Sequence, residues 1–152
     1  MNDAQSKAHE LMGFPAAASA FVSAFEANQR RLAIDAGLTG TELRALFRVA
    51  QVVSMTPKDL ATHLGLTTGA VTAISRRLVE VGLFQRVDHP DDRRSLFLEL
   101  TPHGHGVMTQ LHGDFKDMLA ASTTSLNPQQ LESFTAALAS VASEVRARAN
   151  RP

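Results

Sequence analysis

The chain has 152 residues, of which 44% are hydrophobic, and its 15 Lys and Arg balance 15 Asp and Glu, so its formal net charge is zero. A chain of this length can bury one core, and its balanced charge argues against unselective binding of polyanions, which depends on neutralising phosphates. The absence of cysteine excludes disulfides, thiolate metal sites and nucleophilic cysteine chemistry. The longest uncharged run, residues 11–25, is too short to span a bilayer, so we expect a cytoplasmic protein with no membrane partner.

The spacing of apolar residues predicts two helices before residue 54. The first is expected over about 15–36, because its apolar residues recur three, four and seven apart, and Gly37 suits its C-terminal end. The second starts at the TGTE run, residues 39–42, which has the spacing of a capping box, and it reaches about Val53. Four of its residues are expected to face the core: Leu43, Leu46, Phe47 and Val49.

Two shorter helices follow. The third opens at TPKD, residues 56–59, whose Thr and Pro suit the N-cap and the first helical position, and Gly65 ends it. Either Thr67 or Thr68 caps the fourth, which continues through Val81.

This pair of helices has the spacing of a helix-turn-helix, which rests on Ala61, Gly65, Val71 and Ile74. A small residue lets two helices cross closely, a glycine permits a left-handed turn, and branched residues wedge the second helix against the first. At 100° per residue the fourth helix buries Val71, Ile74 and Leu78 and turns outward Gly69, Thr72, Ala73 and Arg76. Small and hydroxylated groups allow close approach to DNA, and an arginine pairs with guanine or phosphate. An ordinary solvated helix face is the alternative.

A hairpin with a long charged tip follows the fourth helix. Residues 83–87 and 96–100 have strand-like patterns, and the second carries leucine at alternate positions. The tip between them, residues 88–95, reads DHPDDRRS. At such a tip Arg94 can enter the minor groove of DNA, and Asp92 can hold it extended through a bidentate contact. The alternative is a salt-bridged surface loop.

Two more helices complete the chain. Thr101 and Pro102 start the fifth, although Gly104 and Gly106 weaken its first turns. The NPQQ run, residues 127–130, starts the last. Its apolar residues form a narrow seam typical of a helix that packs against another helix, namely Leu131, Phe134, Leu138, Val141 and Val145.

Two adjoining stretches over about residues 38–104 carry more specific motifs. They are LATHLGLTTGAVTAISRRLVEVGLFQR and, after it, HPDDRRSLFLELTPHG. Together they resemble the core of the MarR family of winged-helix transcriptional regulators. The D-x-R wing signature and L-T helix start of that family match Asp92, Arg94, Leu100 and Thr101. Its R-L-x-x-x-G-L-x-x-R element matches Arg77, Leu78, Gly82, Leu83 and Arg86.

The resemblance implies a mainly α fold with a small β-hairpin wing, a winged helix-turn-helix flanked by N- and C-terminal dimerisation helices. Residues 1–37 would form an arm and a dimerisation helix, 38–101 the DNA-binding lobe and 102–152 the C-terminal dimerisation helices, all in one compact chain. Recognition helix 67–81 would enter the major groove and wing 88–95 the minor groove. The resemblance also implies a homodimer and a small-molecule pocket, because many family members answer to small aromatic acids or phenols.

Two positions depart from the family pattern. Arg76 stands where an acid is usual before the R-L pair, and Gly69 stands where Ser or Thr is common, which leaves the base preference open. Residues 56–101 contain six basic and six acidic side chains, so we expect few phosphate contacts and weak non-specific binding.

Other chemistries find less support in the sequence. His103 and His105 invite a metal hypothesis, but on a helix they point about 200° apart and no nearby acid completes a tetrahedral set, so no metal or other cofactor is expected. No phosphate-binding loop or strained nucleophile turn is present, so we expect no enzyme. One alternative is a winged-helix protein-interaction module that does not bind DNA. Another is a DNA-binding protein without an effector, its pocket filled by Phe14, Phe21, Phe25 or Phe47.

We therefore expect a ligand-responsive regulator, a repressor, that binds a pseudo-palindromic operator in double-stranded DNA as a homodimer. Thr67 and Thr68 would contact phosphate at the start of the recognition helix. Thr72 and Arg76 would read the major groove. Arg94 would lie in the minor groove, supported by Asp92.

Overall fold

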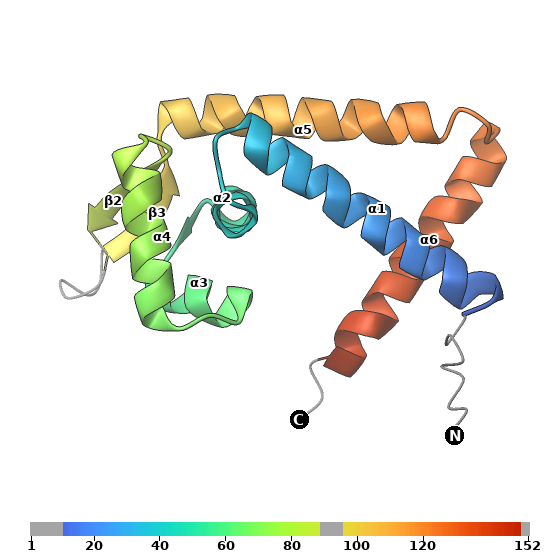
Figure 1. The fold of residues 1–152 in the computed structure, drawn as a ribbon, viewed down its shortest axis with the longest axis horizontal. Helices are drawn as coiled ribbons and strands as arrows, with labels where there is room; N and C mark the ends of the chain where they lie inside the picture. Colours follow the sequence, from blue (N-terminus) through green and yellow to red (C-terminus); the bar gives the residue numbers. More distant parts are fainter. Residues whose placement is uncertain (1–10, 89–95, 150–152) are drawn as a thin grey trace, which may run out of the picture. The chain divides into compact units, whose positions relative to one another are not determined.

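The computed structural model describes residues 11–88 and 96–149. Within these ranges six helices and three strands follow in the order α1, α2, β1, α3, α4, β2, β3, α5 and α6 (Figure 1). The chain divides into two compact units, which meet between Thr109 and Gln110 within α5. The first unit holds the small sheet and the helices around it, and the second holds the rest of α5 and α6.

α1 spans Gly13–Asp35, and the residues near its C-terminal end contribute to the core of the first unit, where Leu32 and Ala33 are buried. Gly37 follows with φ of +66°, a left-handed conformation that ends the helix, so the predicted bounds are confirmed to within two residues.

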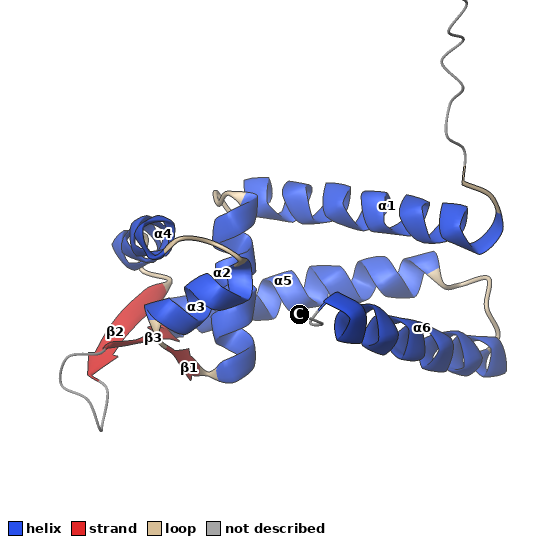
Figure 2. Cartoon of the chain, turned by 90° about the horizontal axis from the view of Figure 1, so that it is seen from below, coloured by secondary structure: helices blue, strands red, loops and turns tan. Residues whose placement is uncertain are grey.

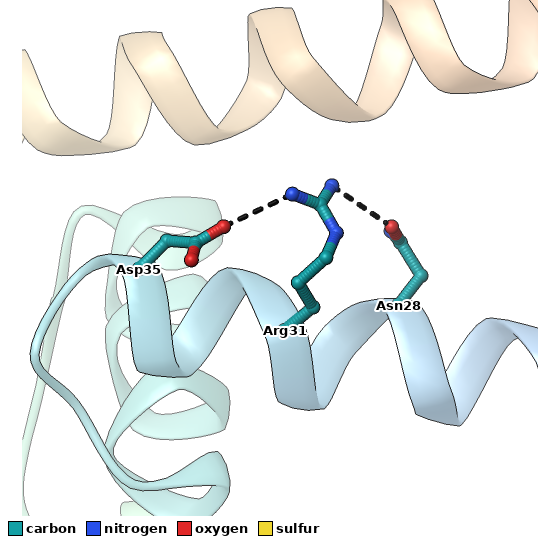
Figure 3. Close-up of polar contacts among 3 residues, drawn as sticks. All are labelled: Asn28, Arg31 and Asp35. Carbon is teal, nitrogen blue, oxygen red and sulfur yellow. Dashed lines mark hydrogen bonds and ion pairs between the residues drawn. The ribbon is translucent and has the colours of Figure 1, made fainter.

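The last two turns of α1 carry a polar cluster on the surface (Figure 3). Nη1 of Arg31 lies 3.0 Å from Oδ2 of Asp35, and Nη2 of Arg31 donates to Oδ1 of Asn28 at 3.3 Å. The Arg31 guanidinium is therefore held by two partners on its own helix.

α2 spans Gly40–Val52, and its start confirms the predicted capping box. The backbone N–H of Thr39 donates to Oε2 of Glu42 at 2.7 Å, and the N–H of Glu42 donates to Oγ1 of Thr39 at 3.2 Å. Of the four residues expected to face the core, Phe47 is half-buried and the other three are buried: Leu43, Leu46 and Val49. Val53 then adopts φ of 68°, an unfavourable conformation for a β-branched residue.

The sheet has three strands in the order β1-β3-β2, all antiparallel, so the hairpin expected from the sequence is joined by a further strand (Figure 2). β2 (Phe84–Asp88) and β3 (Leu96–Leu100) form the predicted hairpin. β1 (Ser54–Met55) pairs with β3 and was not predicted, because two residues are too few to show alternation.

α3 (Pro57–Leu64) and α4 (Thr68–Glu80) pack against each other and against α2. The centre of this unit is formed by fully buried side chains from the helices and the sheet: Leu43, Leu46, Val49, Leu60, Val71, Leu78, Phe84 and Leu98. The mainly α fold with a small wing is therefore confirmed.

α5 spans Pro102–Ser122 and α6 spans Pro128–Ala149. The start of α6 is capped reciprocally by Asn127 and Gln130, whose side-chain oxygens each accept from the other's backbone N–H at 2.9 Å. No residue described in α6 is buried. None of the helices in the described ranges has the length and hydropathy of a membrane span.

Candidate nucleic-acid interface

The turn between α3 and α4 is built by a left-handed glycine. Thr56 caps α3 by accepting from the backbone N–H of Asp59 at 3.1 Å. At the other end Gly65 has φ of 67°, and the next backbone N–H, that of Leu66, donates to the carbonyl of Ala61 at 3.0 Å. These caps set the length of α3 and the point where the chain turns toward α4.

The residues that hold α4 in place differ in one respect from the prediction. Val71 and Leu78 are fully buried, whereas Ile74 is half-buried and Ser75 is 2% exposed. At 100° per residue, Val71 and Leu78 are about 20° apart around the helix axis, and Ile74 and Ser75 lie on opposite sides of this pair, each about 50° from its midpoint. The assignment of Ile74 to the buried face was therefore only partly correct, and helical spacing alone does not distinguish Ile74 from Ser75, because the packing of α4 decides which of them is buried.

The outward face of α4 matches the prediction. Thr67 is the N-cap and accepts from the N–H of Ala70 at 3.2 Å, so Thr68 is the first helical residue. Thr72 is exposed and donates to the carbonyl of Thr68 at 2.8 Å. Gly69 and Ala73 are exposed as well, so the first turns of α4 present hydroxyls and small side chains to solvent.

Arg76 lies one turn beyond Thr72 on the exposed side of α4. Its Nε atom is 3.7 Å from Oε1 of Glu80, and the two side chains are 72% and 58% exposed. An ion pair this long and this exposed contributes little energy, so the guanidinium can leave Glu80 for another partner.

The tip of the wing begins at least one residue later than expected. Asp88 is the last residue of β2 and pairs with Leu96, so it belongs to the strand and not to the tip that was predicted over 88–95. Leu98 and Leu100 are buried, whereas Leu96, which pairs with Asp88 at the end of the hairpin next to its tip, is 39% exposed. Arg94 and Asp92 lie outside the described residues.

The base of the wing is joined to α5 by a close contact that the sequence did not predict. Thr101 donates through Oγ1 to the carbonyl of Gly82, and its backbone N–H donates to the carbonyl of Leu83 at 3.1 Å. The N–H of Gly104 donates to Oγ1 of Thr101 at 2.9 Å. A Cβ atom on Gly104 would lie 2.2 Å from the Leu83 carbonyl oxygen, so only glycine fits at this position.

The histidines of the HGHG run do not converge. His103 and His105 are both exposed near the start of α5. No group of three or more His, Cys, Asp or Glu side chains in the described ranges is placed to hold a metal ion.

Residues 38–96 match the model of the MarR family. The chain is also 31% identical over 75 residues to the multiple antibiotic resistance protein MarR of Salmonella typhimurium, covering 49% of this chain and 52% of that protein. Over these residues the chain is similar to the MarR family. It spans about half the length of the curated MarR proteins that it matches.

Solved structures of the MarR type share the fold. A mutant of MepR from S. aureus superposes with a TM-score of 0.74 at 18% identity, covering 88% of this chain and 99% of that one. A mutant of MarR from E. coli, complexed with operator DNA, superposes with a TM-score of 0.58 at 23% identity, covering 81% and 91%.

Proposed function

We propose that this chain, which is similar to the MarR family, is a ligand-responsive transcriptional regulator of the cytoplasm, a repressor that binds a pseudo-palindromic operator in double-stranded DNA as a homodimer. The observation that carries the proposal is the surface of α4, where exposed threonines and small residues lead to Arg76 and the wing strands follow directly. The operator complex of the E. coli MarR mutant, which has the same fold, supports this function.

In this proposal Thr67 and Thr68 contact phosphates beside the start of α4, where backbone N–H groups also favour anions. Thr72 and Arg76 follow one and two turns later on the same face and read base edges in the major groove. Arg94 is assigned to the minor groove on its motif, with Asp92 as its support, because both lie outside the described residues.

The homodimer is proposed from α6. Five apolar residues run along this helix three or four apart, and each is at least 39% exposed in the single chain: Leu131, Phe134, Leu138, Val141 and Val145. A regular apolar stripe on a helix needs a partner surface, and we propose that a second copy of the chain covers it. Segments 1–37 and 102–152 would then flank the DNA-binding lobe, 38–101, as dimerisation elements.

The effector is proposed by class only, as a small aromatic acid or phenol. In the single chain Phe14 and Phe21 are 67% and 46% exposed, so these two rings do not fill a cavity within it, whereas Phe25 and Phe47 are half-buried. The exposure of Phe14 and Phe21 favours an effector-responsive protein over one whose pocket is closed by those two phenylalanines.

The test is a fluorescence-anisotropy titration on DNA selected from a random pool by the purified protein. Arg76→Ala and Arg94→Ala should each weaken specific binding by about 1–3 kcal/mol, or roughly five- to 150-fold. Arg146→Ala removes the same charge from the exposed last turn of α6 and serves as the matched control. If no sequence is selected, or if both lobe variants bind like the control, the DNA-binding proposal fails and the chain is better explained as a protein-interaction module.

The homodimer has its own test. Leu138→Asp places a charge in the middle of the α6 stripe, so sedimentation should change from a dimer to a monomer. A Ser140→Asp variant adds the same charge elsewhere on the exposed helix and should remain dimeric. A wild-type protein that sediments as a monomer at micromolar concentration would contradict the proposal.

A further inference from the structure

Three basic side chains lie on α2 and α3, two helices that pack against each other. Arg44 and Arg48 lie one turn apart on α2, about 40° apart around its axis. His63 lies in the last turn of α3, which packs against α2. Burial lowers the pKa of His63 below its ordinary value of 6.5, and the positive charges of Arg48 and then Arg44 lower it further.

The acids of these two helices do not neutralise this cluster. α2 and α3 contain one acid each, and both are used at the helix starts: the Glu42 carboxylate accepts from a backbone N–H and the Asp59 carboxylate accepts from a hydroxyl, each at 2.7 Å. In the part of the chain that the structure describes, neither Arg44 nor Arg48 has a carboxylate within ion-pair distance. Arg31, which is held by Asp35 and Asn28, shows the contrasting case (Figure 3).

Arg48 also has an unused donor. Its Nε atom is buried and has no hydrogen-bond partner within residues 11–88 and 96–149. A buried N–H without an acceptor is unfavourable, and a charged acceptor that reached it would form a charge-assisted hydrogen bond. Other N–H groups of the same guanidinium point in fixed directions, which suits the paired oxygens of an oxyanion.

We propose that Arg44, Arg48 and His63 form a binding site for an oxyanion on the surface shared by α2 and α3. The two guanidinium groups would supply paired N–H donors, and the imidazolium of His63 would supply a third positive donor. Because the bound anion would offset the arginine charges, binding would favour protonation of His63. A phosphate of the DNA backbone and a free carboxylate or phosphate molecule both offer this chemistry, and the site itself does not depend on the proposed function.

The first experiment uses sulfate, whose charge does not change between about pH 5 and 8, with the whole chain. Sodium sulfate is titrated against sodium chloride at matched ionic strength while NMR follows the imidazole of His63, which is assigned from the His63→Gln spectrum. We expect a saturable change in sulfate that is absent in chloride and tighter sulfate binding at lower pH. Arg48→Gln should weaken sulfate binding about tenfold or more, because it removes charge-assisted donors.

Two further variants keep the test decisive. Arg44→Gln alters an exposed side chain, so it should fold normally and also weaken sulfate binding. Lys58→Gln removes a positive charge from the start of α3 and is the matched control, because Lys58 is not among the groups that lower the pKa of His63. Equal sulfate binding by Arg44→Gln and Lys58→Gln, or no saturable response to sulfate in the wild type, would overturn the site.

The second experiment separates the two sources of the oxyanion, using the selected DNA. If the anion is a DNA phosphate, DNA will displace sulfate from His63 and Arg44→Gln will reduce the slope of log affinity against log salt by about one. If it is a free small molecule, sulfate will still reach His63 in the DNA complex and the slope will be unchanged. Either result identifies the ligand of a site that the sulfate titration has established without DNA.

Discussion

Replacing Gly104 by alanine should destabilise the protein even though alanine is the better helix former. The added Cβ would lie 2.2 Å from the carbonyl oxygen of Leu83 and 3.2 Å from its carbonyl carbon, and backbone atoms cannot move aside as a flexible side chain can. The start of α5 must therefore shift, which strains the hydrogen bonds of Thr101 to Gly82 and Leu83. Overpacking that forces a backbone shift costs about 1–3 kcal/mol. Subtracting the roughly 1 kcal/mol that alanine gains over glycine in a helix leaves a net loss of up to about 2 kcal/mol.

The assay is thermal or urea denaturation at one fixed protein concentration, because association with a second copy would make the midpoint depend on concentration. A loss of about 2 kcal/mol corresponds to a fall in Tm of roughly 4–8 °C in a protein of this size. Gly106→Ala is the matched control: this glycine is also in α5 but has open space around it, so alanine should stabilise by about 0.4–1 kcal/mol. If Gly104→Ala and Gly106→Ala shift the midpoint in the same direction, the close contact with Leu83 is refuted.

Three further predictions concern the same unit. Val53→Gly should stabilise the protein by about 1 kcal/mol in urea denaturation, because φ of 68° strains valine but not glycine, and destabilisation would argue against that backbone conformation. His63→Gln should reduce the loss of stability that occurs between about pH 7 and 5. Because the pKa of His63 is lowered in the folded protein, the unfolded chain binds a proton first as the pH falls below 6.5, so wild-type stability is full above pH 6.5 and decreases below it. An unchanged pH dependence in the variant would refute this. Glu80→Gln should raise DNA affinity a few-fold and steepen the salt dependence by freeing Arg76, whereas equal affinity would show that the ion pair does not restrain that arginine.

The helix boundaries were predicted well because caps are local. The capping box of Thr39 and Glu42, the N-cap of Thr67 and the left-handed Gly65 each involve residues within four positions of one another. Such short-range contacts depend on residue type and spacing, which the sequence contains directly. The outward face of α4 followed from the same helical geometry, and the hairpin followed from its alternating pattern, apart from the assignment of Asp88 to its tip.

Only the tertiary structure decided the contacts between segments that lie far apart in the chain. β1 exists as a strand because Ser54 and Met55 meet β3, more than forty positions later. Gly104 was expected to weaken α5, yet its missing side chain lets that helix meet Leu83, about twenty positions earlier.

The basic cluster of Arg44, Arg48 and His63 follows the same rule, because α2 and α3 must pack before its members meet. Amino-acid sequence therefore determined where each helix begins and ends and that the fold is mainly α with a small wing. Packing decided which side chains meet, since side-chain contacts depend on the relative positions of elements and not on spacing within any one of them.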